Sequence, residues 1–350
     1  ESYDERVAIE IVKNGFYIPI ANRDGKIIFT FEDYEKLKSK MNGLSYFNQT
    51  EYKFSENLVN QTTENIANQI EESNRVTHEK KNKINRLIIE ALKEVNLELK
   101  TVIDGDLSEG TVELIDTGST GRGTNKPGDG DFDFIMRVDR KILSDPEELE
   151  KLKKSLLKKL NRNDSSGIIA SGDFRLKDVK IDQQTIVDID ITFVEKTDQL
   201  RYSTDMCLQD RLETIYRQDS EKYKYVVANI LLAKQILKEA NVYKPYRSDA
   251  SQGGLGGVGI ENWILQNGGS FIDAARSFVQ ASEGKTWDEF KDIYKIWDFG
   301  ENHLAIKKGN FPHDNFVYNN MSQEGYNKMC SALKKYIKQY EQEQTKERRR

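Results

Sequence analysis

Two short acidic motifs carry the residues of this sequence best suited to chemistry. Asp131 and Asp133 lie two residues apart at the start of an apolar run, and Asp188 and Asp190 repeat this spacing in a second run. Alternation along a strand would place both members of a pair on one face and the apolar residues on the other. Neighbouring carboxylates repel each other unless cations lie between them. The spacing therefore predicts a site for two Mg²⁺ ions, or Mn²⁺ in their place, because Mg²⁺ binds carboxylates together with substrate phosphates.

A glycine-rich stretch precedes the first acidic pair. Gly118 and Ser119 follow a predicted strand and lead into a turn, where backbone N–H groups and a hydroxyl can approach an anion closely. In a two-metal site, one ion lowers the pKa of the attacking hydroxyl and the other holds the triphosphate. A third carboxylate, Asp190 or alternatively Asp188, would bind the first ion and accept the proton. Each motif alone is more often structural, but together and in this order they predict a nucleotidyltransferase site.

The order of these motifs resembles the polymerase-β-like nucleotidyltransferases, which carry Gly-Ser followed by Asp-x-Asp. The stretch from Gly118 to Asp133 is similar to the archaeal-type CCA-adding enzymes, the oligoadenylate synthases and the cyclic GMP–AMP synthase-like bacterial signalling enzymes. The similarity covers about residues 110–275. It implies a magnesium-dependent, ATP-binding enzyme of the α+β class, with a polymerase-β-like mixed sheet and a long N-terminal helix followed by a helical domain.

The resemblance continues beyond the acidic motifs. In the CCA-type pattern a helix lysine precedes a tyrosine by about nine residues, and both contact the triphosphate; Lys234 and Tyr243 keep that interval. A lysine that snorkels from an apolar helix face and an ordinary half-buried tyrosine are the structural alternatives. The resemblance implies these site residues: catalytic and metal-binding Asp131, Asp133 and Asp190, with Asp188 as the alternative, and nucleotide-binding Gly118, Ser119, Arg122, Lys234 and Tyr243.

Two departures separate the chain from the CCA-type enzymes. No histidine lies between His78 and His303, so the CCA-type histidine after the third carboxylate has no counterpart, and little chain remains for tRNA-binding domains. We therefore favour a signalling synthase that joins NTPs into a cyclic or linear oligonucleotide second messenger, as in antiviral defence. An RNA-tailing enzyme of the CCA or poly(A) type is the alternative. A non-catalytic NTP-binding or scaffold protein, and transfer to a protein or small molecule, are the remaining hypotheses.

The composition limits the partners. The 350 residues carry a net charge of −5, so the protein as a whole is not a polyanion binder. We expect NTP substrates, and the resemblance adds an activator protein or RNA. Nothing indicates DNA, and no stretch of ~20 apolar residues indicates a membrane.

Two distant cysteines, Cys207 and Cys330, fit a reducing cytoplasm. The chain starts at Glu1 rather than methionine, so we expect that an upstream segment was removed. The candidate basic clusters, expected to be solvated helix faces, are Lys151, Lys153, Lys154, Lys158 and Lys159, and the tail 346–350.

The predicted elements position these motifs. Asp24-Gly25 between the runs 16–20 and 26–29 predicts a hairpin, with Pro19 confining its strand to an edge. Helical spacing of apolar residues predicts one long helix, or two joined ones, over about 57–99. Strands are expected at 112–115, 132–136 and 186–194. A lysine-rich helix is expected to begin with Ser144 as its N-cap and Glu147 completing a capping box. The chain is expected to be mostly helical from about 208, with a last helix from about 322. We expect two domains, a nucleotidyltransferase core at 1–205 and a helical domain at 206–350.

Overall fold

A computed structural model describes eleven parts of the chain, which group into two compact units. The sheet unit comprises residues 68–200, and the helical unit comprises residues 1–67 and 201–350. Each unit is described by itself. The described residues are 2–3, 21–23, 26–28, 52–99, 110–126, 128, 130–160, 173–196, 204–243, 253–296 and 321–347.

A small sheet lies near the N-terminus. Strands β2 (Ala21–Arg23) and β3 (Lys26–Ile28) are antiparallel, with Arg23 opposite Lys26. Strand β1 (Ser2–Tyr3) pairs with the other edge of β3. The hairpin predicted around Asp24-Gly25 is thus confirmed, but its first strand lies at 21–23. The run 16–20, with Pro19, lies outside the described residues.

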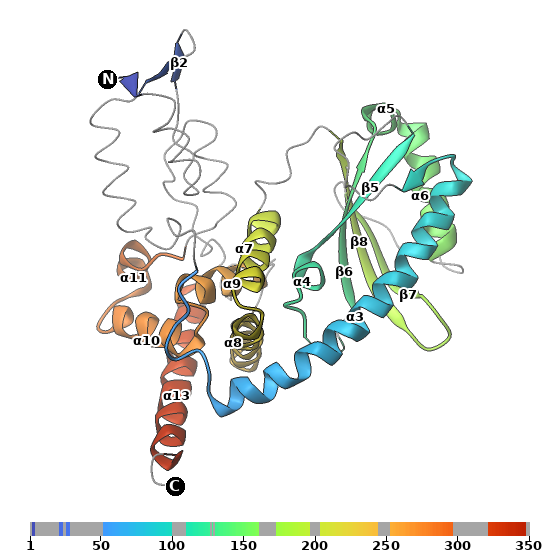
Figure 1. Ribbon diagram of the computed structural model, residues 1–350. Helices are drawn as coiled ribbons and strands as arrows, with labels where there is room; N and C mark the ends of the chain where they lie inside the picture. The colour runs from blue at the N-terminus through green and yellow to red at the C-terminus, as the bar shows by residue number, and fades with distance from the viewer. Residues whose placement is uncertain are drawn as a thin grey trace. The chain divides into compact units, whose positions relative to one another are not determined.

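The sheet unit contains a five-stranded mixed sheet (Figure 1). Its order is β4-β5-β6-β8-β7. β6 runs parallel to β8, while β5 and β7 are antiparallel to their neighbours β6 and β8. The mixed sheet confirms the predicted α+β class. The strands are β4 (Glu98–Leu99), β5 (Thr111–Thr117), β6 (Asp131–Val138), β7 (Asp173–Lys180) and β8 (Ile186–Glu195).

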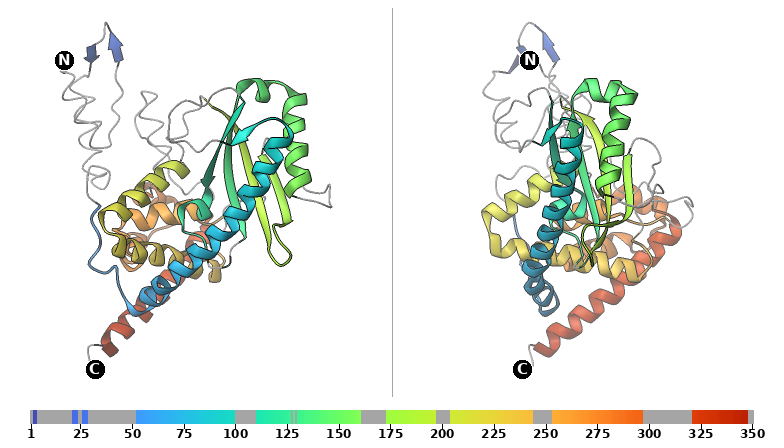
Figure 2. Two further views of the ribbon diagram at one scale, coloured as in Figure 1. Left: turned by 45° about the vertical axis from the view of Figure 1, so that its right-hand side comes forward. Right: turned by 90° about the vertical axis from the view of Figure 1, so that its right-hand side faces the viewer.

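Alternation along β6 and β8 gives the sheet one apolar face. Phe132 and Phe134 of β6 are buried, as are Val187, Ile189 and Ile191 of β8. They form a hydrophobic core with apolar residues of helices α3 (Gln61–Glu94) and α6 (Pro146–Leu160). Figure 2 shows both helices beside the sheet. The residues between the apolar ones therefore lie on the opposite face.

Helix α3 is a single helix of 34 residues. Of the two predicted alternatives, one long helix or two joined ones, the first is therefore correct. Its buried positions Ile84, Ile88, Ala91 and Leu92 recur at helical spacing and pack against the sheet. No glycine or proline interrupts this helix. The long N-terminal helix implied by the resemblance is present.

The cap of α6 differs from the prediction. Ser144 ends the short helix α5 (Arg140–Ser144), and α6 begins at Pro146. The carboxylate of Asp145 accepts hydrogen bonds from the backbone N–H groups of Glu147 at 2.9 Å and Glu148 at 3.4 Å. Asp145 therefore caps the helix, and the prediction of Ser144 was wrong, because an aspartate one residue closer to the proline reaches the free N–H groups.

The helical unit is built around one large apolar core. Trp263 and Phe271 are fully buried at its centre, and their rings meet edge to face at 5.9 Å. Helix from about residue 208 and a last helix from about 322 were both predicted, and both are present. The helices are α7 (Thr204–Gln218), α8 (Ser220–Glu239), α9 (Gly257–Gln266), α10 (Phe271–Ser282), α11 (Trp287–Ile293) and α13 (Gln323–Glu347).

Residues 52–60 form a strap that is bound to this helical core before α3 begins. The backbone N–H of Ser55 donates to the carbonyl of Gly268 at 2.9 Å. The buried side chain of Asn229 donates to the carbonyl of Leu58 at 2.8 Å and accepts from the backbone N–H of Phe271 at 2.9 Å. These contacts fix the start of α3 to the helical unit.

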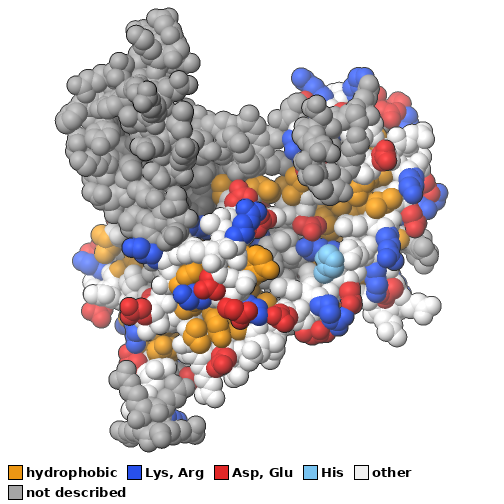
Figure 3. Space-filling view, in the orientation of Figure 1, with side chains coloured by type: hydrophobic (Ala, Val, Ile, Leu, Met, Phe, Trp, Pro, Cys, Tyr) orange, Lys and Arg blue, Asp and Glu red, His pale blue; other side chains and the backbone are white. Residues whose placement is uncertain are grey.

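Two surface features bear on partners. Within the described ranges, no helix combines the length and apolar composition that a bilayer crossing requires. On the face shown in Figure 3, acidic and basic side chains are interspersed over the described surface. Interspersed charge is typical of an ordinary solvated surface rather than of a single-charge binding face.

Candidate active site

Four aspartates share the face of the large sheet that lies opposite its apolar core. Asp131 and Asp133 lie on β6, and in the parallel pairing they stand opposite Asp188 and Asp190 of β8. Asp131 is exposed and the other three are half-buried. The apolar neighbours of all four lie on the opposite face, as the alternation predicted. The pairing brings the two motifs together as one acidic row, which we call the carboxylate row.

Gly118 lies directly against this row. It begins the short helix α4 (Gly118–Arg122) after β5, and its φ of 63° is in the left-handed region. A Cβ atom at this position would lie 1.9 Å from Oδ2 of Asp133. Only glycine can therefore occupy the position while Asp133 keeps its place. The glycine-serine turn and the carboxylate row are thus in contact.

The other predicted residues of this turn differ in accessibility. Ser119 is half-buried in the first turn of α4, whereas Arg122 is buried with 5% of its surface exposed. Beyond the helix, the backbone N–H of Thr124 donates to the carbonyl of Ser119 at 2.9 Å. The turn is therefore held by its own backbone.

Helix α3 supports the same turn from the apolar side of the sheet. Lys81 forms an ion pair with Asp116 at 2.9 Å, two residues before Gly118. The side-chain nitrogen of Asn125 donates to the hydroxyl of Thr77 at 3.2 Å. Both ends of the turn are therefore attached to one helix.

Both candidates for the third carboxylate are engaged by the neighbouring strand β7. The two carboxylate oxygens of Asp190 both contact the guanidinium of Arg175. One accepts from Nε at 2.9 Å, and the other lies 2.7 Å from a terminal nitrogen. Asp188 accepts from the backbone N–H of Asp178 at 2.9 Å. Each contact fixes a carboxylate in the row, and neither decides which one is the third ligand.

The carboxylate row matches the ligand chemistry of Mg²⁺. Hard carboxylate oxygens on one face are the ligands this ion takes, completed by substrate phosphates. Among the described residues, however, no three acidic, histidine or cysteine side chains lie close enough to hold one metal ion. The donors have the right chemistry, and the arrangement around Asp190 is set by Arg175.

A second polar group lies inside the helical unit. Lys234 of α8 is 3% exposed and forms an ion pair at 2.7 Å with Glu261 of α9, whose side chain is fully buried. The lysine interrupts the apolar side of α8, as predicted, but its ammonium group is buried and does not snorkel to solvent. A buried charge requires a partner of this kind.

Tyr243 follows α8 in the chain and lies close to Lys234 and to the first residue of α9. Tyr243 and Leu255 form an isolated parallel bridge. A Cβ atom at Gly257, the first residue of α9, would lie 3.1 Å from the Tyr243 hydroxyl and 3.9 Å from Cε of Lys234. The lysine and the tyrosine thus meet near a helix N-terminus, where free backbone N–H groups favour an anion.

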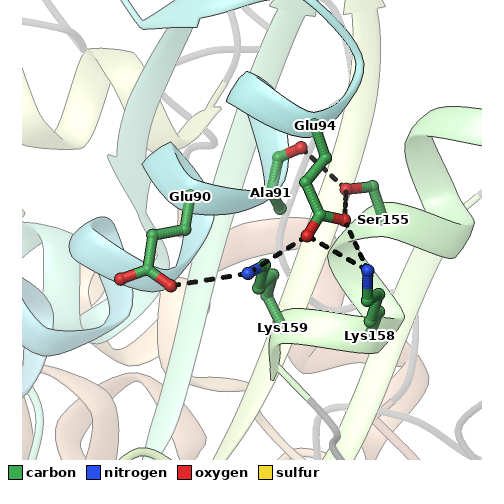
Figure 4. A network of polar contacts seen from close by, with 6 residues as sticks. All are labelled: Glu90, Ala91, Glu94, Ser155, Lys158 and Lys159. Atoms are coloured by element: carbon green, nitrogen blue, oxygen red, sulfur yellow. Dashed lines mark hydrogen bonds and ion pairs between the residues drawn. The ribbon is translucent and has the colours of Figure 1, made fainter.

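The predicted basic cluster on α6 is largely neutralised by glutamates. Glu94 of α3 pairs with Lys158 at 3.2 Å and with Lys159 at 3.1 Å, and Glu90 lies 3.7 Å from Lys159 (Figure 4). The hydroxyl of Ser155 donates to the carbonyl of Ala91 at 2.7 Å. Two further pairs lie along α6, Lys151 with Glu148 at 2.5 Å and Lys154 with Glu150 at 3.8 Å. The side chains of Lys151, Lys154 and Lys158 are 60%, 71% and 69% exposed, so the cluster is largely a solvated helix face, as expected. Of the basic tail, 348–350 lie outside the described residues.

Sequence reasoning missed Arg175 and Glu261, which contact predicted site residues, and Lys81, which contacts Asp116 just before the glycine-serine turn. Arg175 lies on β7, whose alternation is broken by a register shift between Leu176 and Val179. Glu261 is a charged residue in an otherwise apolar helix, and that mismatch was a usable signal. Lys81 gave no signal, because a lysine on a long charged helix is ordinary.

Comparisons with known proteins add the following. No protein-family model matches the chain, and no curated protein matches it in sequence. Among solved structures, the chain is similar to the CdnC:HORMA-deltaN complex of E. coli MS115-1, with 13% identity, 86% of this chain and 88% of that chain covered, and a TM-score of 0.43. It is also similar to terminal uridylyl transferase 4 from Trypanosoma brucei with bound GTP, with 11% identity, coverage of 80% and 98%, and a TM-score of 0.44.

A third similar structure is the STING-associated CdnE c-di-GMP synthase from Capnocytophaga granulosa. Identity is 13%, coverage is 77% of this chain and 81% of that chain, and the TM-score is 0.43.

Proposed function

We propose that the protein is a magnesium-dependent nucleotidyltransferase that joins NTPs into a cyclic or linear oligonucleotide. The observation that carries this proposal is the carboxylate row on β6 and β8, with the Asp133 carboxylate packed against Gly118. A binding module does not need several carboxylates beside a glycine-serine turn. Transfer of a nucleotidyl group does, because charge develops on both the attacking and the leaving oxygen.

In the proposed reaction, an acceptor hydroxyl attacks the α-phosphorus of an NTP and pyrophosphate leaves. Bound Mg²⁺ would lower the pKa of that hydroxyl and neutralise the leaving group. Asp131 and Asp133 would hold the ions, with Asp190, or Asp188, as the third ligand. A carboxylate oxygen of this third residue would accept the hydroxyl proton. The backbone N–H groups and hydroxyl of Gly118-Ser119 would bind the phosphates.

Two further predicted contacts belong to the same proposal. Near the N-terminal end of α9, Tyr243 would offer a hydroxyl to phosphate, and Lys234 would offer a cation on exchanging its ion pair with Glu261 for the phosphate. Arg122 is buried, so we propose that it supports the turn after Gly118 in addition to any contact with nucleotide.

The acceptor is proposed to be another NTP rather than RNA. RNA binding depends on cations along its backbone path, whereas the lysines of α6 lie on a helix that packs on the apolar face of the sheet, opposite the carboxylate row. The net charge of −5 points the same way. The product would serve as a second messenger, and antiviral defence and a cytoplasmic location remain part of this proposal.

The test is incubation with Mg²⁺ and radiolabelled NTPs, with and without RNA. We expect a phosphatase-resistant small product without RNA, and a loss of at least about a hundredfold in rate for Asp131→Asn and Asp133→Asn. Asp288→Asn is the matched control, since the Asp288 side chain is 81% exposed on α11 in the helical unit. Full turnover by the β6 variants would refute the site, and label only on RNA would favour the RNA-tailing alternative.

A further inference from the structure

Arg175 is a basic residue that contacts the carboxylate row. It stands opposite Asp190 in the antiparallel pairing of β7 with β8. Its Nε lies 2.9 Å from one carboxylate oxygen of Asp190, and a terminal nitrogen lies 2.7 Å from the other. Both oxygens of Asp190 are therefore engaged by a single guanidinium group, the two-pronged geometry in which arginine binds carboxylates most strongly.

This contact opposes metal binding at Asp190. A divalent ion bound to Asp190 needs at least one of the oxygens that the guanidinium contacts. Asp188 differs, because its partner is the uncharged backbone N–H of Asp178. Of the two candidates for the third ligand, Asp190 is therefore the one at which a cation competes with a charged side chain.

Arg175 is also placed to give way. β7 is an edge strand of the described sheet, and the Arg175 side chain is 53% exposed, compared with 27% for Asp190. Solvent screens a pair with this exposure, so a divalent ion can compete with the guanidinium even in its two-pronged geometry. The arginine can therefore turn to solvent without disturbing the core.

We propose that Arg175 is a positioning residue that holds Asp190 until a divalent ion displaces it, and thereby sets the metal affinity of the carboxylate row. This inference rests on the proposed function, since it takes the row to be the metal site. It assigns Asp190 two successive partners, first the guanidinium and then the ion.

The test measures Mn²⁺ binding without nucleotide, from the EPR signal of free Mn²⁺. Arg175→Gln is expected to bind Mn²⁺ about two- to fivefold more tightly than the unaltered chain, the range that corresponds to an exposed ion pair. Arg175→Lys keeps the charge and should remain close to the unaltered chain. Lys177→Gln, which removes a charge from an exposed position of the same strand, is the matched control and should change the affinity much less.

A second arm separates the specific pair from general electrostatics. In an Asp190→Asn background, adding Arg175→Gln should leave Mn²⁺ affinity unchanged, because the competing carboxylate is gone. Equal affinities of Arg175→Gln and the unaltered chain, or equal gains from Arg175→Gln and Lys177→Gln, would overturn the inference. Loss of Mn²⁺ binding in Asp131→Asn would still support the row as the metal site. If Asp131→Asn bound Mn²⁺ as the unaltered chain does, the proposed function itself would fail.

Discussion

At the scale of single residues, Gly118 and Asp133 depend on each other. The glycine has a positive φ, and the space of its missing side chain is filled by the Asp133 carboxylate. The turn thereby determines where this carboxylate lies. A change at Gly118 should act on chemistry through Asp133.

We predict that Gly118→Ala lowers NTP turnover at least about tenfold, because the new Cβ would displace Asp133. Gly110→Ala is the matched control. It has a φ of 79°, but no atom of the described residues lies within 4 Å of its Cβ position. Both variants should lose about 1–2 kcal/mol of stability from the left-handed backbone, measured by urea unfolding. Equal turnover in the two variants would show that Asp133 does not depend on Gly118.

The buried pair of Lys234 and Glu261 leads to a second prediction. Lys234→Met would leave Glu261, which is fully buried, without its charged partner. We expect a loss of about 3–5 kcal/mol in the free energy of unfolding. The double variant Lys234→Met with Glu261→Gln should recover most of this loss. A double variant as unstable as the single one would show that the pair acts through packing alone.

At the scale of elements, the N-terminus of α6 shows how narrowly a cap is defined. Asp145→Ala removes the acceptor for two backbone N–H groups, so we predict a loss of about 1 kcal/mol. Ser144→Ala should cost much less, because the Ser144 hydroxyl contacts only the carbonyl of Lys141, at 3.5 Å, among its described contacts. Thermal unfolding of both variants measures the difference. A larger effect at Ser144 would restore the cap predicted from the sequence.

The contact between α3 and α6 should depend on pH. Hydrogen bonds from Lys159 and then Lys158 lower the pKa of Glu94 below its ordinary value. A lowered pKa contributes stability above the unfolded value, near pH 4.5, and this contribution is lost as pH falls through the folded value. The stability difference between the unaltered chain and Glu94→Gln should therefore shrink from pH 7 to pH 4 in urea unfolding. A difference that grew on acidification would contradict this assignment.

At the scale of the whole molecule, each unit has its own apolar core, and neither core includes the carboxylate row. Folding should therefore not depend on the metal. We predict that EDTA abolishes NTP turnover but shifts the Tm by less than about 2 °C. Activity should return with Mg²⁺ or Mn²⁺. Unfolding by EDTA would instead indicate a structural metal.

The division of the chain into two units is a property of the whole molecule. The sequence predicts a boundary near residue 205, and the chain groups into residues 68–200 on one side and 1–67 with 201–350 on the other. The strap at 52–60 accounts for the grouping of the N-terminal segment, because its hydrogen bonds go to α8 and to the residues around 268–271. The two-domain boundary remains a prediction.

The sequence by itself determined the features that depend on local periodicity. Alternation placed Asp131 and Asp133 together on one face of their strand, and Asp188 and Asp190 together on one face of theirs. Helical spacing of apolar residues predicted α3. These patterns are set by backbone geometry within a few residues. Cap selection at Asp145 failed because two adjacent residues can both act as caps, and only the backbone path distinguishes them.

Only the tertiary structure decided which of these residues meet. The parallel register that sets Asp131 opposite Asp188, the guanidinium of Arg175 on Asp190, and the pairing of Lys234 with Glu261 join residues far apart in the chain. Strand register and buried ion pairs follow from how whole hydrophobic faces fit together, and no short window of sequence contains that information.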